Sequence, residues 1–193
     1  MAIRKLPADD RIDQIVDAVE TIIVRERTLA FGMHQVATEI ASSRALIYVY
    51  FESIPEVIDE LCSRHADALA DRLAGAGNRG DAAARARALA LAYLDYLIER
   101  GPALHFILRD SERNGRLSKS KPILRALIRS VTKEARALLD VEWREALVLV
   151  ELLVAIPDTL ARLLREGRID LAVARDTCDR LVFDLVSDLR VVR

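Results

Sequence analysis

Hydrophobic residues recur along nearly the whole chain at the spacing of an α-helix, and this periodicity limits the possible folds more than any other feature. In the first such segment, from about Asp10 to Arg27, they follow the i, i+3, i+4, i+7 pattern of an amphipathic helix. The residues of this stripe are Ile12, Ile15, Val16, Val19, Ile22 and Ile23. Similar stripes follow between breaks that contain glycine or proline, and no segment is a credible strand. We therefore expect an all-α protein of about nine helices.

The chain of 193 residues is long enough for one large domain or for a small module joined to a larger one. Its two cysteines, Cys62 and Cys178, lie far apart without C-x-x-C spacing, so we expect reduced thiols and no bound metal. No apolar run approaches the ~20 residues that span a bilayer, and the chain does not begin with the apolar core of a signal peptide. We expect a cytoplasmic protein with no membrane segment and no cofactor.

The N-terminal part of the chain has the arrangement of a helix-turn-helix unit. Two short helical segments, Met33–Ile40 and Arg44–Phe51, follow the first helix. Only the residues "ASS" separate them, and this spacing is typical of the motif whose last helix lies in the major groove of DNA. We expect this DNA-binding unit to occupy residues 1–52.

The third of these helices has an apolar side and a free side. On a helical wheel its residues divide into Ile47, Tyr50 and Phe51 on one side and Ala45, Tyr48 and Val49 on the other. A tyrosine on the free side can hydrogen-bond a phosphate oxygen or pack on a thymine methyl group. Ser43 and Arg44, at the start of the helix, could reach base edges or phosphate. The residues alone leave an alternative open, in which Tyr48 and Tyr50 pack between helices.

Residues 11–61 resemble the N-terminal domain of the tetracycline-repressor (TetR) family of transcriptional regulators, and they align with its pattern without a gap. The segment "RIDQIVDAVETIIVRER" is similar to the first helix of the family, and "MHQVATEIA" is similar to the second. The segment "SSRALIYVYFES" is similar to the turn and recognition helix, whose pattern L-Y-x-[YH]-F is matched by Ile47–Phe51 with Ile in place of Leu. The rest of the chain matches the family only in its helical layout.

The resemblance implies a dimeric regulator, a repressor in most such proteins, that binds double-stranded DNA at a palindromic operator and releases it when a small molecule binds. It implies DNA contacts from the start of the second helix and from the turn and third helix: Gly32, Met33, His34, Ser43, Arg44, Ala45, Leu46, Tyr48, Val49 and Tyr50. Residues 43–46 would face bases, and residues 48–50 would face the backbone. For His34 a second interpretation stays open, because a lone histidine is commonly a solvated surface residue.

Several positions depart from the family pattern in ways that weaken DNA binding. Ala41 stands where the family has Gly, Ser42 where it has Val, Ile54 where it has Lys, and Gly32 where it has a Ser or Thr cap. If Ala41 is left-handed, it costs on the order of 1 kcal/mol relative to Gly. Residues 1–60 also hold six Lys and Arg against eleven Asp and Glu, whereas residues 61–193 hold 23 against 19. Because phosphate neutralisation supplies most nonspecific affinity, we expect weaker binding than in a typical member.

We expect residues 53–193 to form a helical domain for ligand binding and dimerisation. Ser53 and Glu56 have the spacing of a capping box at its first helix. The last two helices, about 142–166 and 170–190, are apolar on nearly all sides and so should pack on two sides. The resemblance implies that they form the homodimer interface, and a monomer with a thick core is the alternative.

By the same resemblance, the middle helices would enclose a cavity for a small apolar or aromatic molecule. The candidate lining residues are Tyr93, Tyr96, His105, Phe106 and Trp143. A second function is a module of the same fold that binds small molecules or proteins with weakened or lost DNA binding, which the acidic N-terminal part and the altered turn favour. An enzyme is not expected, since the sequence contains no G-x-S-x-G, H-E-x-x-H, P-loop or dinucleotide-binding motif.

Overall fold

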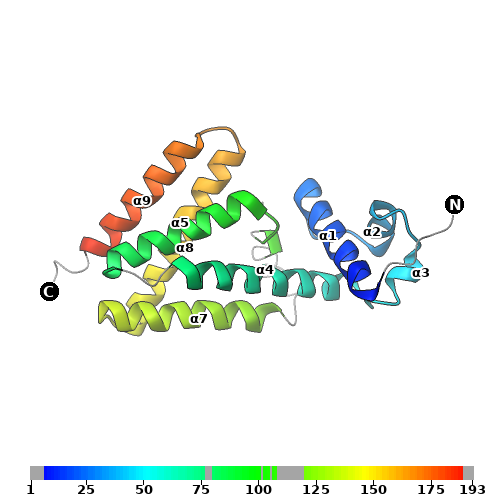
Figure 1. Ribbon diagram of the computed structural model, residues 1–193, viewed down its shortest axis with the longest axis horizontal. Helices are drawn as coiled ribbons and strands as arrows, with labels where there is room; N and C mark the ends of the chain where they lie inside the picture. Colours follow the sequence, from blue (N-terminus) through cyan, green and yellow to red (C-terminus); the bar gives the residue numbers. More distant parts are fainter. Residues whose placement is uncertain (1–6, 77–79, 101, 105, 108–119, 189–193) are drawn as a thin grey trace. The chain divides into compact units, whose positions relative to one another are not determined.

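The computed structural model describes residues 7–76, 80–100, 102–104, 106–107 and 120–188. These residues form eight helices and no strand, so the expectation of an all-α protein of about nine helices is confirmed (Figure 1). The helices are α1 (Ala8–Glu26), α2 (Met33–Glu39), α3 (Arg44–Ile47), α4 (Ile54–Ala76), α5 (Ala82–Arg100), α7 (Ser120–Leu139), α8 (Trp143–Arg165) and α9 (Leu171–Asp188). No helix among the described residues is both long enough and apolar enough to cross a membrane.

The chain divides into two compact units. The first unit consists of residues 1–65 and 103–122, and the second consists of residues 66–102 and 123–193. Helix α4 contributes to both units, because its residues up to His65 belong to the first and the remainder to the second. The predicted boundary between residues 52 and 53 stays a prediction.

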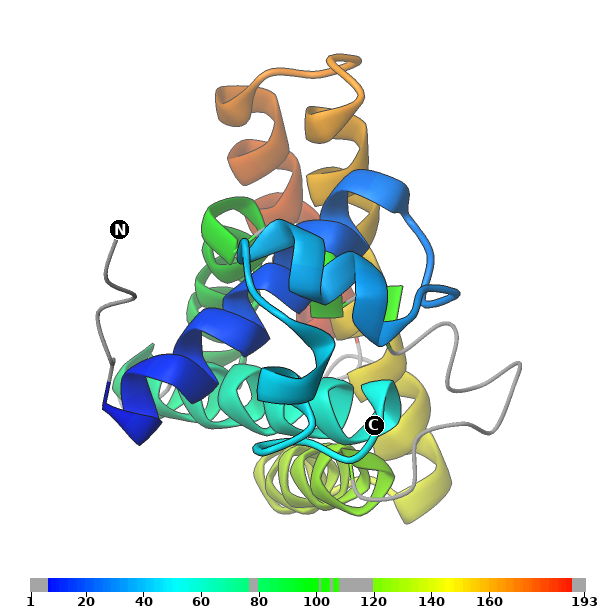
Figure 2. The ribbon, with the colours of Figure 1, turned by 90° about the vertical axis from the view of Figure 1, so that its right-hand side faces the viewer.

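The core of the first unit is built from the apolar stripe predicted for α1. Helix α2 packs against α1, and α3 packs against α2 (Figure 2). The fully or almost fully buried side chains include Ile15, Val16, Val19, Ile22 and Ile23 of α1, Val36 of α2, Ile47 of α3 and Val57 of α4. Burying so many β-branched and aliphatic side chains stabilises this unit by removing apolar surface from water.

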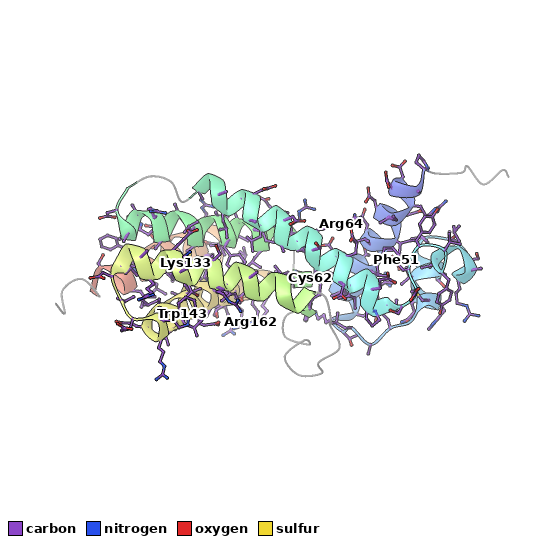
Figure 3. All side chains as sticks on the ribbon, turned by 90° about the horizontal axis from the view of Figure 1, so that it is seen from below. Phe51, Cys62, Arg64, Lys133, Trp143 and Arg162 are labelled. Carbon is purple, nitrogen blue, oxygen red and sulfur yellow. The ribbon has the colours of Figure 1, made fainter. Side chains whose placement is uncertain are left out.

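Polar contacts attach α4 to α1 within the first unit. Arg64 (Figure 3) donates to Asp13 Oδ1 at 2.7 Å and to Glu60 Oε1 at 2.9 Å. One residue further along α4, His65 is buried, and its Nε2 lies 3.3 Å from Glu20 Oε1. These contacts join the start and the end of α1 to successive residues of α4.

The second unit is organised around α5, which packs against both α8 and α9. Arg87 on α5 donates to both carboxylate oxygens of Asp179 on α9 at 2.7 and 2.5 Å, and its guanidinium lies 5.5 Å from the ring centroid of Phe183. Two turns along α5, Asp95 accepts a hydrogen bond from Arg175 of α9. Helix α8 continues through Pro157, where the sequence predicts a kink or a local break.

Candidate nucleic-acid interface

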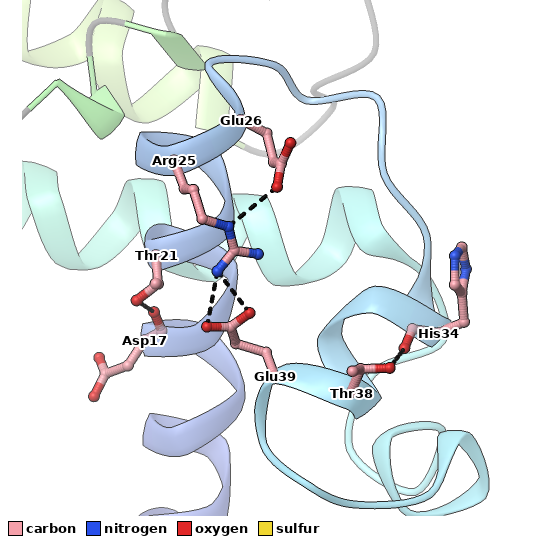
Figure 4. Close-up of polar contacts among 7 residues, drawn as sticks. All are labelled: Asp17, Thr21, Arg25, Glu26, His34, Thr38 and Glu39. Carbon is pink, nitrogen blue, oxygen red and sulfur yellow. Dashed lines mark hydrogen bonds and ion pairs between the residues drawn. The ribbon is translucent and has the colours of Figure 1, made fainter.

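Helix α2 begins at a glycine that has no capping side chain. Gly32 is the N-cap residue, and its backbone N–H donates to Gln35 Oε1 at 2.8 Å, so half of a capping box is present. The side chain of Met33 is buried, whereas that of His34 is exposed. Thr38 donates its hydroxyl to the His34 carbonyl oxygen at 2.9 Å (Figure 4). A DNA contact from Met33 would therefore use its backbone, while His34 presents a side chain.

An ion pair links α2 to α1. Arg25 near the end of α1 donates through Nη1 to both carboxylate oxygens of Glu39, at 3.0 and 2.9 Å (Figure 4). The hydrogen bond that Arg25 donates to Glu39, followed by the one it donates to Glu26, raises the pKa of Arg25 above its ordinary value. The pair holds the C-terminal end of α2 against α1. It also neutralises the charge of an arginine that could otherwise bind phosphate.

The turn between α2 and α3 is closed by backbone hydrogen bonds around a left-handed residue. Ala41 has φ 49°, which is the left-handed region that favours glycine. Its N–H donates to the Thr38 carbonyl at 3.1 Å, and the N–H of Ser42 donates to the Ala37 carbonyl at 2.8 Å. This pattern is a Schellman motif, in which the residue after the C-cap is usually Gly. Ala41 therefore has the left-handed conformation that the resemblance to the family raised for this position.

Helix α3 is shorter than the sequence predicts. Ser43 is its N-cap and accepts a hydrogen bond from the Leu46 N–H at 3.2 Å. The helix ends at Ile47, because Val49 and Tyr50 donate to carbonyls three residues earlier, at 3.2 and 2.9 Å, and so tighten the last turn. The predicted helix ran to Phe51, and this boundary is corrected.

Two faces of α3 and the turn that follows it differ sharply in exposure. Ile47 is 0% exposed and Phe51 is 7% exposed, whereas Tyr48 is 55% and Val49 is 73% exposed. The wheel prediction that Ile47 and Phe51 face the core is confirmed, and so is the free position of Tyr48 and Val49. Tyr48 does not pack between helices. Tyr50 is half-buried, so it lies between the two faces.

The predicted DNA-contacting residues therefore separate into two groups. The turn and α3 bring five of them together as exposed residues: Ser43, Arg44, Ala45, Tyr48 and Val49. Leu46 and Tyr50 are half-buried beside them, and Gly32 and His34 lie at the start of α2.

Few positive charges are available for phosphate among residues 7–65 of the first unit. Within residues 7–65 the arginines are Arg11, Arg25, Arg27, Arg44 and Arg64, and there is no lysine. Arg25 and Arg64 are engaged by carboxylates, and Arg11 donates to Gln14 Oε1 at 2.5 Å. Arg44 is exposed and makes no ion pair with any described residue. It is therefore the available cation on the exposed face of α3.

The candidate ligand-binding residues are distributed over both units of the structure. Tyr93 and Tyr96 are buried on α5 in the second unit, and Tyr93 donates its hydroxyl to Asp158 Oδ1 of α8 at 3.2 Å. Burial and the neighbouring Asp158 raise the pKa of Tyr93 above its ordinary value. Trp143 is exposed at the start of α8. Phe106 is half-buried and belongs to the first unit, and His105 lies outside the described residues.

Helices α8 and α9, which pack against each other, carry many exposed apolar side chains. These are Trp143, Leu147, Val148 and Leu152 on α8 and Leu171, Val173, Leu181 and Phe183 on α9. On α8, Val148, Leu152 and the exposed Ala155 follow the i, i+4, i+7 spacing of a stripe on one helix face. This stripe is separate from the buried side of α8, which includes Leu149 and Val150.

Comparison with known proteins gives matches among solved structures alone, since no protein-family model and no curated protein sequence matches the chain. A TetR-like transcriptional regulator from Rhodococcus sp. RHA1 is 18% identical, with a TM-score of 0.73, over 93% of this chain and 97% of that one. A TetR-family transcriptional regulator from Streptomyces coelicolor is 21% identical, with a TM-score of 0.73, over 97% of this chain and 83% of that one. The chain has the TetR fold. The fatty acid degradation regulator FadR from Bacillus halodurans also has a similar structure, at 16% identity and a TM-score of 0.70 over 94% of this chain and 97% of that one.

The sequence predicted the exposed face of α3 but not the ion pair that links α2 to α1. The exposed face of α3 followed from helical periodicity, because a wheel reports which side of a helix is buried. The pair of Arg25 and Glu39 was missed, since it joins residues 14 positions apart on different helices. Glu39 and Arg25 have no local spacing that would predict this contact.

Proposed function

We propose that this chain is a dimeric, ligand-responsive transcriptional regulator that binds a palindromic DNA operator in the cytoplasm. The observation that carries the proposal is the exposed group Arg44, Ala45, Tyr48 and Val49, held on a base of buried Ile47 and Phe51. A short helix-turn-helix element presents its recognition side chains in this way, with one side packed on the domain and the other free for the major groove.

Polar groups at the start of α2 and just after α3 suit the backbone of DNA. The Tyr48 hydroxyl and the His34 imidazole are exposed, and both can hydrogen-bond phosphate oxygens. Arg44 adds one positive charge per protomer. Contacts of this kind fix the position of a protein on the duplex, and base contacts then supply specificity.

A second copy of the chain is the proposed partner for α8 and α9. Val148, Leu152 and Ala155 form an exposed apolar stripe on α8, and Val173 and Phe183 are exposed on α9. Exposed apolar side chains in this number on two neighbouring helices are typical of a protein interface. A two-fold symmetric pair would present two copies of α3 to the two halves of a palindrome.

The proposed effector is a small apolar or aromatic molecule that binds the second unit. Tyr93 and Tyr96 are buried there on α5, and Tyr93 is hydrogen-bonded to Asp158. An effector that binds one arrangement of the dimer better than another would shift the population away from the DNA-binding arrangement. One structural neighbour is described as a fatty acid degradation regulator, which makes acyl compounds a reasonable first set of candidate effectors.

A gel-shift experiment with the region upstream of the protein's own gene tests the proposal. The full chain should retard at least one fragment at low salt, and Arg44→Ala should weaken the shift. Arg129→Ala removes an exposed arginine from α7 and is the matched control that should leave the shift unchanged. Failure of every upstream fragment to shift at low salt would contradict the proposal.

The alternative function, a binding module without DNA recognition, is favoured by the acidity of residues 7–65. Residues 7–65 contain eleven Asp and Glu against five Arg. If this alternative holds, Arg44→Ala and Tyr48→Ala leave the expression of neighbouring genes unchanged. Under the regulator proposal, both variants change it.

A further inference from the structure

The four side chains exposed on α3 and the turn after it offer only a few kinds of chemical group for contact with DNA. Arg44 supplies a guanidinium, Tyr48 a phenol, and Ala45 and Val49 supply aliphatic groups. The group contains no carboxylate and no carboxamide. Glu52, the next exposed side chain along the chain, follows the buried Phe51 and is not part of this face.

These chemistries match some base edges of the major groove and not others. A guanidinium can donate both hydrogen bonds to O6 and N7 of guanine, while aliphatic and aromatic carbon packs on the C5 methyl of thymine. Bidentate recognition of adenine uses Asn or Gln, and an acceptor for the cytosine amino group uses Asp or Glu. Neither type is present among Arg44, Ala45, Tyr48 and Val49. The face is therefore suited to guanine and thymine.

The spacing of the four residues sets how much DNA they can reach. Arg44 and Ala45 lie on α3, and Tyr48 and Val49 lie in the tightened turn that follows it. At about 1.5 Å per residue in α3 and about 2.0 Å per residue in the 3₁₀-type turn, Arg44 and Val49 are separated by roughly 8.5 Å along the axis. Since successive base pairs are about 3.4 Å apart, the four side chains span about three adjacent base pairs.

The scarcity of free positive charge makes the apolar contacts important for affinity. Arg44 is the available arginine on this face, whereas Arg25 and Arg64 are held by carboxylates. Val49 is 73% exposed, so packing it on a methyl group would remove apolar surface from water on both partners. Affinity that phosphate contacts cannot supply would then come from the bases themselves.

From these observations we infer that α3 recognises a short major-groove element in which guanine adjoins thymine, through Arg44 and through methyl contacts to Val49, Tyr48 and Ala45. The inference rests on the DNA binding proposed above. It adds the chemical class of the half-site, which neither the fold nor the structural neighbours specify.

Chemically altered DNA tests the inference with the full-length protein. Duplexes are first selected from a random-sequence library, and each recovered half-site should contain thymine next to guanine. Replacing those thymines by deoxyuridine removes only the methyl groups and should lower affinity by at least about 5-fold. Replacing the guanine by 7-deazaguanine removes the N7 acceptor and should lower affinity by a similar factor of about 5 or more.

Variants then assign each effect to a side chain. Val49→Ala should lower the penalty for deoxyuridine, of which Tyr48 and Ala45 keep a part, and Arg44→Ala should make the protein nearly indifferent to 7-deazaguanine. The matched controls Val24→Ala and Arg129→Ala remove an exposed valine of α1 and an exposed arginine of α7, and they should keep both penalties.

Two failures can be told apart. Selected sites without a guanine–thymine element, or affinities unchanged by either base analogue, overturn the inference and leave DNA binding intact. An absence of any enriched duplex overturns both the inference and the proposed function.

Discussion

The backbone N–H of Ser42 donates to the carbonyl oxygen of Ala37 at 2.8 Å, and this hydrogen bond closes the turn that leads from α2 into α3. For the bond to form, Ala41 between them adopts φ 49°. A left-handed alanine is strained by its Cβ, which glycine does not have. The turn that positions α3 is therefore built on an unfavourable residue.

Replacing Ala41 by glycine should stabilise the protein. Glycine removes the steric cost of the left-handed conformation, although it also loses more backbone entropy on folding. The net expectation for Ala41→Gly is an increase of about 1 kcal/mol in the free energy of unfolding. Urea denaturation followed by circular dichroism measures the change.

Ala45→Gly is the matched control for this prediction. Ala45 is an exposed residue inside α3, where glycine should lower the free energy of unfolding by about 1 kcal/mol. Substitutions of the same chemistry four residues apart thus have opposite signs. Equal effects at both positions would show that the turn conformation is not the cause.

Helical periodicity predicted the buried side of each element near the interface, because it depends only on residues close in sequence. The stripe of α1 is buried from Ile15 onward, with Ile12 half-buried at its start, and Ile47 and Phe51 support α3 from inside. The same reasoning placed Tyr48 and Val49 outside. A helical wheel predicts which face of a helix is buried, and here that prediction is correct.

Local hydrogen bonding and long-range pairing were less predictable. The expected capping box of Ser53 and Glu56 is displaced by one residue, since Glu56 Oε2 accepts from the backbone N–H of Glu52 at 2.7 Å. Arg87 and Asp179 form a bidentate ion pair although they are 92 positions apart. Such contacts depend on how distant helices meet, and that information is not contained in the spacing of neighbouring residues.

Introducing a lysine at the start of α4 should strengthen DNA binding. Ile54 is the first residue of α4 and is half-buried, so a lysine there can keep its stem on the protein and extend its ammonium into solvent. Each added phosphate contact should steepen the dependence of log K on log salt concentration by about 0.9. Fluorescence anisotropy over a salt series measures this slope for Ile54→Lys.

The control for this gain of charge is Ile128→Lys. Ile128 is an exposed isoleucine of α7 in the second unit, and lysine there adds the same charge to a different unit from that of α3. Only Ile54→Lys should show the steeper slope. A slope that rises equally in both variants would mean that net charge, and not position, controls binding.

A charge placed on the exposed face of α8 should prevent dimerisation. Leu152 is exposed between Val148 and Ala155 on this face, and a glutamate there would be buried without a partner in a symmetric interface. We expect Leu152→Glu to sediment as a monomer of the mass of one chain, 21.6 kDa, while the wild-type protein sediments as a dimer. Loss of the palindromic gel shift should accompany it.

Ile128→Glu is the matched control for the dimer interface, since it places the same charge on an exposed apolar position of α7. It should remain dimeric in sedimentation equilibrium. If both variants are dimers, the α8 stripe does not form the interface, and if the wild-type protein is itself a monomer, the proposed assembly is wrong.

Stability at alkaline pH should depend on Cys178. Its thiol is fully buried on α9, and burial, followed by the nearby Asp179, raises its pKa to about 11. An unfolded cysteine has a pKa of about 8.5. Well below pH 8.5 the thiol is protonated in both the folded and the unfolded state, so its full contribution to the free energy of unfolding is present. Between about pH 8.5 and 11 the unfolded state releases the proton while the folded state retains it, so stability falls as the pH rises.

The expected loss from this single group between pH 7 and 10 is about 2 kcal/mol, because the slope approaches about 1.36 kcal/mol per pH unit only above pH 8.5. Cys178→Ala should be less stable at pH 7, because it leaves a small cavity, but its stability should decline less steeply over this range. Val182→Ala removes buried volume one turn further along α9 without removing a thiol, so it should keep the wild-type slope. Urea denaturation at pH 7, 8.5, 9.25 and 10 separates the two variants. Parallel pH profiles for both would show that Cys178 is not the titrating group, since only the loss of a proton from this thiol makes the slopes differ.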